Sequence, residues 1–516
     1  MELPAVEVRK LVRKADLWLM ALVAVSAALF VYRRGQDQNW DLLGYHFFTG
    51  YAYLNGRGLQ DVAPAGLGSY LHPAPNVFSY LCFSHLAFPY SAWAILGVQL
   101  LSVPALVGIS RELATILGIR ETAPSRHIAW LLGLLSPVWL SELGTSFFSS
   151  STAVLILWGL FLLFWNRPPR SAWWLASGAM FGLAAGLKLT NGPFAVAALV
   201  TAIWLTLSAE RLTLVSLGSF VIGLCGGFLL TAGWYWYLWT NWESPIFPLY
   251  NKLFKSPFFD LVNLRDLRWQ FEGFEDFSTF LVQVAFGTKK TIEPIFADAR
   301  LIVLVLLVPG ALVGKSTTRL ANAALIAFLL FFLTGFALWA QMFAYQRYLI
   351  PLELLVGLVI WVLLVRLIEQ ETMRVAALLL ISALSVWAIK IPEWGHVRIA
   401  SGSRDVFGIS IPQRFASTPA RYLVIGQPSS YILPSLHVDS QFFGLGVSRQ
   451  LDEVIGRRLG ETSTLPVRLL QLGDAEPTTA DALEAVGIRP SSYRLDCEGV
   501  RTHRFKYAIC ELVPNR

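Results

Sequence analysis

Residues 16–34, DLWLMALVAVSAALFVYRR, form an apolar run, and a polar and aromatic loop follows it directly. The loop, residues 36–76, reads QDQNWDLLGYHFFTGYAYLNGRGLQDVAPAGLGSYLHPAPN. A helix needs about 20 apolar residues to cross a bilayer core, so the run is expected to span the membrane. No clear small-x-small cleavage site precedes Arg33, which favours an uncleaved span over a signal peptide. The two segments together predict a membrane helix that carries a chemically rich loop to one face of the bilayer.

Similar apolar runs recur along the 516 residues. The chain is 55% hydrophobic and only 15% charged, with a mean hydropathy of +0.55, whereas a soluble domain carries about 25% charged residues. The net charge of +7 does not indicate nucleic acid, because much of the Lys and Arg lies in short loops between apolar runs. That distribution sets membrane topology. The sequence therefore predicts an α-helical polytopic membrane protein with no nucleic-acid partner.

The apolar runs predict about eleven transmembrane helices and a cytoplasmic N-terminus. The basic residues before the first span are Arg9, Lys10, Arg13 and Lys14, and short cytoplasmic segments are enriched in such residues. Segment 76–90 is apolar but short and ends near Pro89, so it is interpreted as a juxtamembrane or re-entrant piece. If it spanned, the orientation of every later segment would invert. The expected spans are 16–34, 91–110, 127–141, 150–165, 171–187, 192–208, 213–239, 300–314, 320–340, 349–365 and 375–390.

This topology divides the chain into two domains. Residues 1–390 are expected to form the transmembrane domain, with a first outer loop at 35–90 and a second large outer loop at 240–299. Residues 391–516 carry more charge and short β-like runs, with a helix expected at 479–487. They predict a small extracytoplasmic α/β domain.

The four cysteines show no metal-ligand spacing. Cys82 and Cys225 lie in apolar runs, where they are expected to be packing residues. Cys497 and Cys510 flank an expected hairpin in the C-terminal domain. A disulfide between them suits an extracytoplasmic compartment, and two unpaired buried thiols are the alternative.

Unusual polar residues collect at the expected outer ends of the helices, while the middles of the helices carry almost no charge. A transporter normally keeps ionisable residues near the bilayer midplane, so this asymmetry favours an enzyme that works at the outer surface. The candidate site residues are Asp41, Tyr45, His46, His72, Glu142, Lys188, Asn191 and Arg347.

Structural explanations compete for several of these residues. Asp41 follows a helix end and could be a solvated N-cap carboxylate. Lys188 ends a helix rich in small residues and could reach to the membrane interface. Glu142 could cap the helix predicted before it. Arg347, in the tight outer turn AYQRYLIP, has the least ordinary position, because outer turns tend to avoid arginine.

The acidic first outer loop, the many spans and the C-terminal extracytoplasmic domain together resemble the GT-C superfamily of membrane glycosyltransferases. This superfamily includes the protein mannosyltransferases, aminoarabinose transferase and the family 87 enzymes that use polyprenyl-phosphate donors. The likeness covers roughly residues 15–390. Segments similar to bacterial members are SPVWLSELGT at 136–145, GLKLTNGP at 186–193, SPIFPLYN at 244–251 and QRYLIP at 346–351.

The resemblance implies that Asp41, in NWDLLGYH, is the catalytic aspartate of the first outer loop. It implies inverting transfer of a sugar from a polyprenyl-phosphate-linked lipid to a glycan, lipid or protein acceptor, at the extracytoplasmic face of the inner membrane. A loop carboxylate suits the general base that an acceptor hydroxyl needs. Lys188 and Arg347 would stabilise the departing phosphate, and His46 or Tyr45 would orient the sugar or the acceptor.

This sequence departs from the superfamily pattern in two ways. Many relatives carry a second Asp after the third helix, but this stretch reads GTSFFSSS at 144–151 and leaves Glu142 as the nearest acid. The first loop has no D-x-D or E-x-D pair, so no cofactor is certain, and a divalent metal stays an open alternative without a motif to support it. Asp41 is therefore expected to act as a lone carboxylate served by distant cations.

Two other functions stay open at this point. A polysaccharide polymerase or O-antigen ligase with a diphosphate-linked donor would use several outer-loop cations. Those available are Lys252, Lys255, Arg265, Arg268, Lys289, Lys290 and Arg300. A non-enzymatic transporter or flippase would need a pathway of polar residues through the helices, and none is visible in the sequence.

Overall fold

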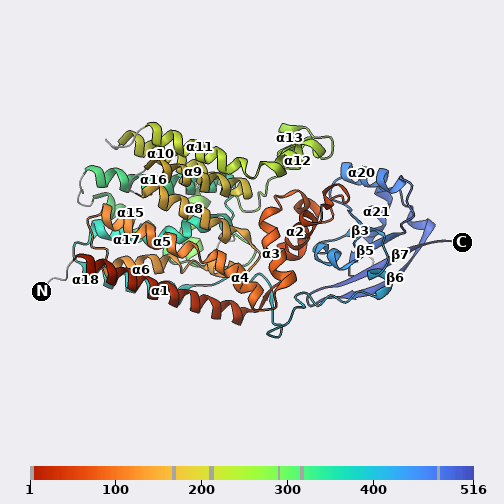
Figure 1. The fold of residues 1–516 in the computed structure, drawn as a ribbon, viewed down its shortest axis with the longest axis horizontal. Helices are drawn as coiled ribbons and strands as arrows, with labels where there is room; N and C mark the ends of the chain where they lie inside the picture. Colours follow the sequence, from red (N-terminus) through yellow and green to blue (C-terminus); the bar gives the residue numbers. More distant parts are fainter. Residues whose placement is uncertain are drawn as a thin grey trace.

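The computed structural model describes residues 5–165, 170–208, 214–288, 291–313, 319–473 and 477–515. It is an elongated molecule with a helical bundle at one end and a smaller α/β unit at the other (Figure 1). The N-terminus lies at the far end of the bundle and the C-terminus at the far end of the α/β unit. The side chains of Arg9, Lys10 and Arg13 lie outside the described residues, as do Lys289 and Lys290.

The bundle contains α1 (Ala5–Arg34), α4 (Tyr90–Gln99), α5 (Ser102–Ile116), α6 (Pro124–Gly133), α7 (Pro137–Glu142), α8 (Phe148–Phe164), α9 (Arg170–Leu187), α10 (Gly192–Ser208), α11 (Leu214–Leu229), α12 (Ala232–Trp242), α15 (Arg300–Val313), α16 (Arg319–Met342), α17 (Ile350–Leu367) and α18 (Glu371–Ala388). Within the described residues, 6 helices are long and apolar enough to cross a membrane, or up to 7 with the bent pair α11–α12. The chain is a multi-pass membrane protein, and the count of eleven spans stays a prediction.

Three expected helices are broken. The expected span 213–239 is two helices, α11 and α12, which meet at 52°. At this bend the Thr231 carbonyl oxygen lies 3.2 Å from His72 Nε2, outside the helix. The expected span 127–141 ends early because Ser136 Oγ accepts from Trp139 N and Pro137 begins a new helix, α7. The expected span 91–110 is α4 and α5, with a break at residues 100–101.

Segment 76–90 does not form a long apolar helix. It lies largely within α3 (Ala74–His85), a helix of 12 residues that ends before Pro89. In Figure 1, α2 (Phe47–Leu54) and α3 lie between the bundle and the α/β unit. The interpretation as a juxtamembrane piece agrees with this position.

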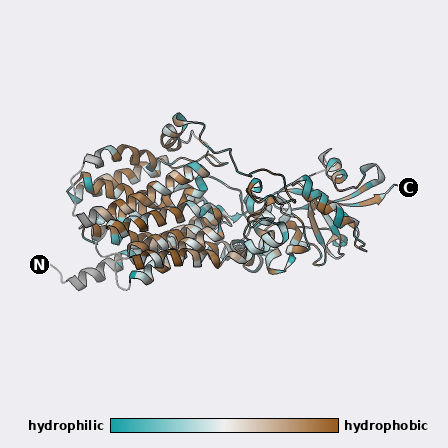
Figure 2. Cartoon of the chain, turned by 90° about the horizontal axis from the view of Figure 1, so that it is seen from above, coloured by the Kyte–Doolittle hydropathy of each residue, from teal (hydrophilic) through white to brown (hydrophobic). Residues whose placement is uncertain are grey.

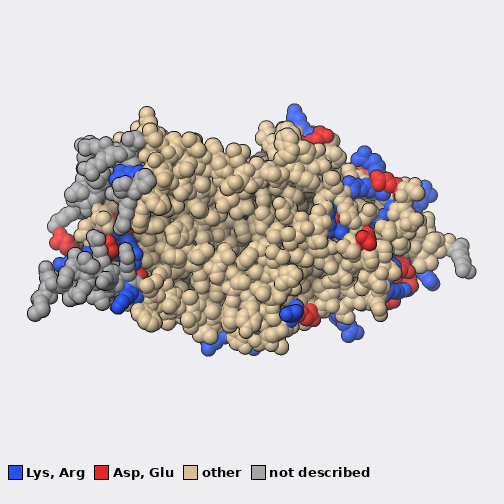
Figure 3. Space-filling model, viewed as in Figure 1, with Lys and Arg blue, Asp and Glu red and all other residues tan. Residues whose placement is uncertain are grey.

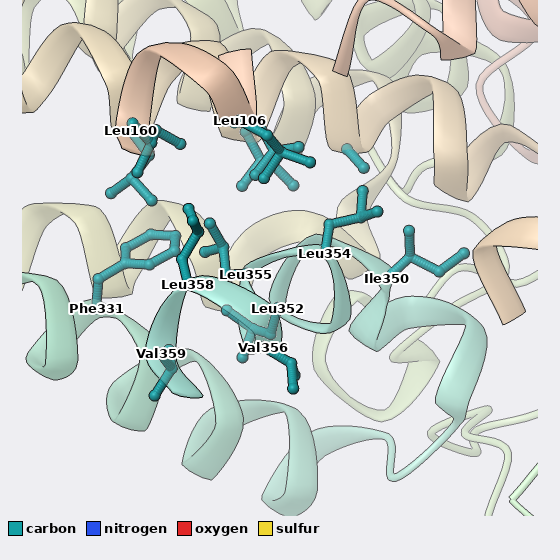
Figure 4. Packing of buried hydrophobic residues seen from close by; sticks show 14 of the residues in the cluster. Leu106, Leu160, Phe331, Ile350, Leu352, Leu354, Leu355, Val356, Leu358 and Val359 are labelled. Atoms are coloured by element: carbon teal, nitrogen blue, oxygen red, sulfur yellow. The ribbon is translucent and has the colours of Figure 1, made fainter. Parts of the chain in front are cut away.

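Close helix packing in the bundle depends on small residues. A Cβ atom on Gly178 would lie 2.0 Å from the Phe220 carbonyl oxygen, so α9 and α11 approach through their backbones. Gly357 gives α17 and α6 the same closeness, because its Cβ would lie 2.2 Å from the Ala129 carbonyl oxygen. Helix α17 is buried from Ile350 to Leu364. Figure 4 shows its leucines packed among side chains of α5, α8 and α16.

Charge and hydropathy divide the molecule in the same way as the fold. Hydrophobic residues dominate the bundle in Figure 2, and hydrophilic residues are more frequent toward the α/β unit. On the face shown in Figure 3, the coloured charges lie mostly toward the two ends, and the broad surface between them is almost uncharged. An uncharged band on this face of the bundle suits contact with a bilayer.

The C-terminal unit contains a five-stranded sheet in the order β4-β3-β5-β7-β6. Strand β3 pairs in parallel with β4 and β5, whereas β7 pairs antiparallel with β5 and β6. The α/β class is therefore confirmed. Its elements are α19 (Gln413–Ala416), β3 (Arg421–Ile425), η6 (Ser430–Ser435), β4 (Gln441–Gly444), α20 (Arg449–Gly460), β5 (Val467–Leu472), α21 (Pro477–Ala485), η7 (Pro490–Ser492), β6 (Tyr493–Arg501) and β7 (Lys506–Pro514).

The α/β unit is fastened internally and to the first outer loop. Cys497 and Cys510 lie opposite each other on β6 and β7 and form a disulfide, so the expected pairing is correct. Strand β1 (Gln36–Asp37) pairs with β2 (His396–Val397), and Val62 pairs with Phe443. The first loop is thereby held between the bundle and the sheet. The remaining outer elements are η1 (Leu42–His46), η2 (Arg57–Leu59), η3 (Gly66–Tyr70), α13 (Asn251–Phe254) and α14 (Phe274–Ala285).

Candidate active site

A cavity of about 850 Å³ lies where the first outer loop meets the end of α9, the loop after α12 and the turn before α17. Six of the eight candidate residues line it: Asp41, Tyr45, His46, His72, Lys188 and Arg347. Three of these segments, the first outer loop, the end of α9 and the turn before α17, contribute the six side chains. The cavity has the size and mixed polarity typical of a site for a small molecule or a headgroup.

Arg347 lies at the centre of the polar wall of this cavity. Its Nη1 and Nη2 atoms both donate to Asp41 Oδ2, each at 3.1 Å. Its Nε atom lies 3.3 Å from Glu142 Oε1. The expectation that Asp41 is a lone carboxylate with distant cations is wrong, because the turn η5 (Gln346–Leu349) brings Arg347 into direct contact with it.

Glu142 supports Arg347 from behind and does not line the cavity. It is fully buried, and its Oε2 accepts from the backbone N of Ser150 at 2.8 Å and from Ser150 Oγ at 2.7 Å. Its Oε1 forms no hydrogen bond within the described residues, nor does Arg347 Nε, although the two atoms face each other. The two groups therefore form an ion pair without a hydrogen bond between them.

Aromatic rings enclose the guanidinium group of Arg347. Its Cζ lies 3.7 Å from the ring centre of Phe147 and 5.2 Å from that of Trp394. Aromatic faces attract a desolvated cation, so these rings hold Arg347 in place between its two carboxylates. Trp394 was missed in the sequence because it is remote in the chain and has no motif around it.

Asp41 is not a helix cap. The backbone N of Leu42 is instead bound by Asn39 Oδ1 at 2.8 Å, and Asp41 makes no capping hydrogen bond. The structural explanation for this carboxylate therefore fails. Asp41 precedes the π-helical turn η1, which places Asp41, Tyr45 and His46 on the cavity wall.

The surroundings set the charge of these three groups. Burial acts to raise the pKa of the Asp41 carboxyl, but nearby groups, the Arg347 guanidinium first among them, outweigh it, so the pKa is lowered. Burial lowers the pKa of His46 to about 3 and keeps the ring neutral. Burial also raises the pKa of Tyr45 well above its ordinary value, so its phenol stays protonated.

Lys188 lies in the same cavity as Arg347. Its Nζ donates to Ser149 Oγ at 2.7 Å and lies 4.9 Å from the ring centre of Tyr348. It follows α9 and precedes the short turn η4 (Leu189–Asn191). The side chain therefore points into the site, and it does not extend along the membrane interface.

His72 and Asn191 each lie close to a backbone carbonyl oxygen of the helical scaffold. His72 lines the cavity, and its Nε2 lies 3.2 Å from the Thr231 carbonyl oxygen at the α11–α12 bend. Asn191 does not line the cavity. Its Nδ2 donates to the Ala184 carbonyl oxygen at 2.9 Å, which ties η4 to α9. These contacts give Asn191 a place in the scaffold around Lys188.

A second charged group on the cavity wall was not anticipated from the sequence. Tyr345 Oη donates to Glu293 Oε2 at 2.7 Å and lies 3.3 Å from Arg347 Nη1. Arg268 pairs with Asp266 at 2.7 Å and approaches Glu293 at 3.5 Å. A chain of polar contacts thus links Arg347 to the loop after α12.

The outer-loop cations that the structure describes do not gather into a second anion site in the cavity. Arg300 is buried against Asp298 at 2.6 Å. Arg265 donates to the carbonyl oxygens of Gln341 and Met342. Of this loop's cations, Arg268 alone lines the cavity, in the part of the chain that is described. Searched over the same part, the chain has no group of three or more His, Cys, Asp or Glu that could hold a metal ion.

No protein-family model and no curated protein matches this sequence. Solved structures do match, over nearly the whole chain, and they have the GT-C fold of membrane glycosyltransferases. One is ArnT from Cupriavidus metallidurans bound to undecaprenyl phosphate, with a TM-score of 0.53, 13% identity and coverage of 96% of this chain and 97% of that chain. Another is the same protein in the apo state, with a TM-score of 0.52, 13% identity and coverage of 96% and 98%. The predicted GT-C fold is confirmed.

Proposed function

We propose that this protein is a membrane glycosyltransferase that moves a sugar from a polyprenyl-phosphate-linked lipid to an acceptor hydroxyl. One observation carries the proposal: a carboxylate, Asp41, and two basic side chains, Arg347 and Lys188, line a single cavity of about 850 Å³. A base for the acceptor and cations for the leaving phosphate are what such a transfer needs. The fold likeness to ArnT, a protein solved with undecaprenyl phosphate bound, agrees with a lipid phosphate in this place.

The reaction is a single displacement at the anomeric carbon of the sugar. The acceptor oxygen forms a bond to this carbon, and its proton passes to the Asp41 carboxylate. The bond from the anomeric carbon to the phosphate oxygen breaks, and its electron pair stays on that oxygen. Polyprenyl phosphate leaves with one more negative charge than the phosphodiester carried. One displacement inverts the configuration of the anomeric carbon.

Arg347 ties the base to the leaving group. In the free protein it pairs with Asp41, which holds the carboxylate in place and lowers its basicity. A lipid phosphate in the cavity competes for the two Nη atoms of Arg347. When these Nη atoms bind the phosphate instead, the Asp41 carboxylate loses their stabilising contact and becomes a stronger base than in the free protein. Glu142 stays behind the guanidinium and keeps it in the site.

The proposed orientation has the N-terminus in the cytoplasm and the α/β unit outside the inner membrane. The two lie at opposite ends of the molecule (Figure 1), and a disulfide suits an oxidising compartment. Alkaline phosphatase fused after residue 516 should be active, and the same fusion in the 117–123 turn should be inactive. An inactive C-terminal fusion would show that the orientation is the reverse of the proposed one.

The proposal is tested with the Asp41→Asn variant in reconstituted membranes. The substrates are a panel of undecaprenyl-phosphate-linked sugars with membrane extract as the acceptor source, and released undecaprenyl phosphate is measured. We expect a loss of about 100- to 10,000-fold, as for removal of a general base, with undecaprenyl phosphate binding kept. The matched control is Asp439→Asn, an exposed carboxylate of the α/β unit. Full activity of Asp41→Asn would refute the assigned role.

A further inference from the structure

A chain of buried hydrogen bonds leads from Asp37 to His46. Ser146 Oγ lies 2.9 Å from Asn39 Nδ2 and 3.0 Å from His46 Nδ1. Asn39 Nδ2 is also 2.8 Å from both oxygens of Asp37, and the backbone N of Ser146 donates to Asp37 Oδ2 at 2.8 Å. All four side chains are at most 5% exposed. The chain joins the first outer loop to the loop before α8.

The direction of each hydrogen bond in this chain is fixed. Asn39 Oδ1 accepts from the backbone N of Leu42 at 2.8 Å, so the amide nitrogen of Asn39 must face Asp37 and Ser146. Ser146 Oγ therefore accepts from Asn39, and its one hydrogen remains to be placed. The remaining partner of this oxygen in the described chain is His46 Nδ1. A buried hydroxyl hydrogen without an acceptor is costly, so Ser146 donates to Nδ1.

This accounting settles which ring nitrogen carries the proton. A neutral imidazole has one donor and one acceptor nitrogen. Since Nδ1 accepts, Nε2 must carry the hydrogen. His46 lines the cavity, and Nε2 has no hydrogen-bond partner in the described part of the chain. The charged groups that face this ring across the cavity are Asp41, Arg347 and Lys188.

We infer that His46 is a neutral hydrogen-bond donor whose Nε2–H binds an oxygen of the lipid phosphate, and that Ser146, Asn39 and Asp37 are positioning residues that fix this tautomer. The inference rests on the proposed function for its ligand. Burial and the charges of Arg347 and Lys188 disfavour a cationic ring and outweigh the attraction of Asp41, so the pKa of His46 is lowered. During transfer His46 keeps its proton and stabilises the charge that develops on the leaving oxygen.

Two substitutions of His46 separate its two nitrogen positions. The amide nitrogen of Gln can take the place of Nε2, whereas the shorter Asn reaches only to the place of Nδ1. We expect His46→Gln to keep turnover within about 5-fold of the parent, and His46→Asn to lose about 100-fold in kcat, as when one preorganised donor is removed. Undecaprenyl phosphate is the binding probe. Equal losses in both variants, or a fully active His46→Asn, would overturn the inference.

The tautomer is measured without any turnover, by NMR of protein labelled with ¹⁵N-histidine, with His46→Gln used to assign the signal. We expect Nε2 protonated and Nδ1 bare in the parent, and a mixture of tautomers in Ser146→Ala. The control Ser102→Ala removes an equally buried serine hydroxyl that bonds to the Gln99 carbonyl oxygen, and it should leave the signal unchanged. A protonated Nδ1 in the parent, or an unchanged Ser146→Ala spectrum, refutes the assignment.

The two measurements also separate this inference from the proposed function. If no sugar is transferred but the Nε2–H tautomer and its dependence on Ser146 are seen, the proposed function fails and the tautomer stands. If sugar is transferred and the ring is protonated at Nδ1, the proposed function stands and the tautomer assignment fails. If one phosphate binds both His46 and Arg347, addition of undecaprenyl phosphate should shift the Nε2 signal in the parent and leave it unshifted in Arg347→Lys.

Discussion

The two ends of the helical bundle each hold a buried cluster of carboxylate and guanidinium groups, and the clusters differ in how completely their atoms are paired. Near the N-terminus, Arg126 Nη2 donates to both oxygens of Asp16, each at 3.0 Å. Its Nε and Nη1 atoms donate to the Glu121 carbonyl oxygen and to Ser110 Oγ. At the other end, Arg347 Nε and Glu142 Oε1 face each other without a hydrogen bond.

The two clusters also differ in their position relative to the cavity. The Asp16 cluster does not line the 850 Å³ cavity, and its ion pairs with Arg111 and Arg126 hold α1, α5 and α6 together. Asp41 and Arg347 line the cavity of about 850 Å³, whereas Arg347 Nε and Glu142 Oε1 form no hydrogen bond within the described residues. Buried polar groups are normally satisfied, so the long contact between Arg347 Nε and Glu142 Oε1 leaves Arg347 less completely bonded than Arg126.

The largest expected contrast comes from the same substitution at both ends. Arg347→Lys keeps the charge but loses the two-pronged contact, so sugar transfer should fall about 100-fold with little change in thermal stability. Arg126→Lys breaks fully buried bonds and should lower the free energy of unfolding by about 3 kcal/mol, while the folded fraction keeps its activity. Transfer assays and melting curves of the two purified variants measure both quantities. If Arg347→Lys melts as early as Arg126→Lys and stays active, the two clusters have the same role.

A smaller effect is expected from Glu142→Gln. The glutamine side chain is equal in size and its oxygen can still accept from Ser150. It carries no negative charge, so the ion pair with Arg347 is lost. Since opposite charges about 4 Å apart attract each other by about 1–4 kcal/mol near a protein surface, we expect transfer to fall about 10-fold, mainly through weaker binding of the lipid phosphate.

The control for Glu142→Gln is Glu453→Gln, the same substitution at an exposed carboxylate of α20. That variant leaves the Arg347 pair in place, because Glu453 contacts Arg449 on its own helix. Transfer at the parent rate by Glu142→Gln, with equal affinity for undecaprenyl phosphate, would leave Glu142 with a packing role alone.

Much of this organisation could be read from the sequence, because the bilayer imposes a strong pattern on it. Apolar runs of span length predict helices, and the change in composition after residue 390 predicts a soluble unit. Asp41, Lys188 and Arg347 could be selected because charged residues are rare at the expected outer ends of helices. The helix breaks at Ser136 and Thr231 were missed, because hydrogen bonds to single side chains interrupt the helices without changing hydropathy.

The internal wiring of the site could not be predicted from the sequence. The contact of Asp41 with Arg347 joins residues 306 positions apart, and Trp394 comes from a segment with no motif. Glu142 was selected for its charge, but its position behind Arg347 depends on how α7 and η5 pack. Asp37 and Asn39 were passed over because the spacing of a loop does not reveal which side chain caps the turn and which faces the cavity.

The smallest expected effect concerns pH and Asp41. Arg347 lowers the pKa of this carboxyl despite its burial, so the pair stabilises the folded state fully above the ordinary carboxyl pKa of about 3.9. That contribution is lost as pH falls through the lower folded value. The melting difference between the parent and Asp41→Asn, about 1 kcal/mol, should be constant from about pH 5 to pH 8 and vanish in stronger acid. A difference that grows on acidification would mean that the carboxyl is protonated in the fold, and Asp41 could not then serve as a base.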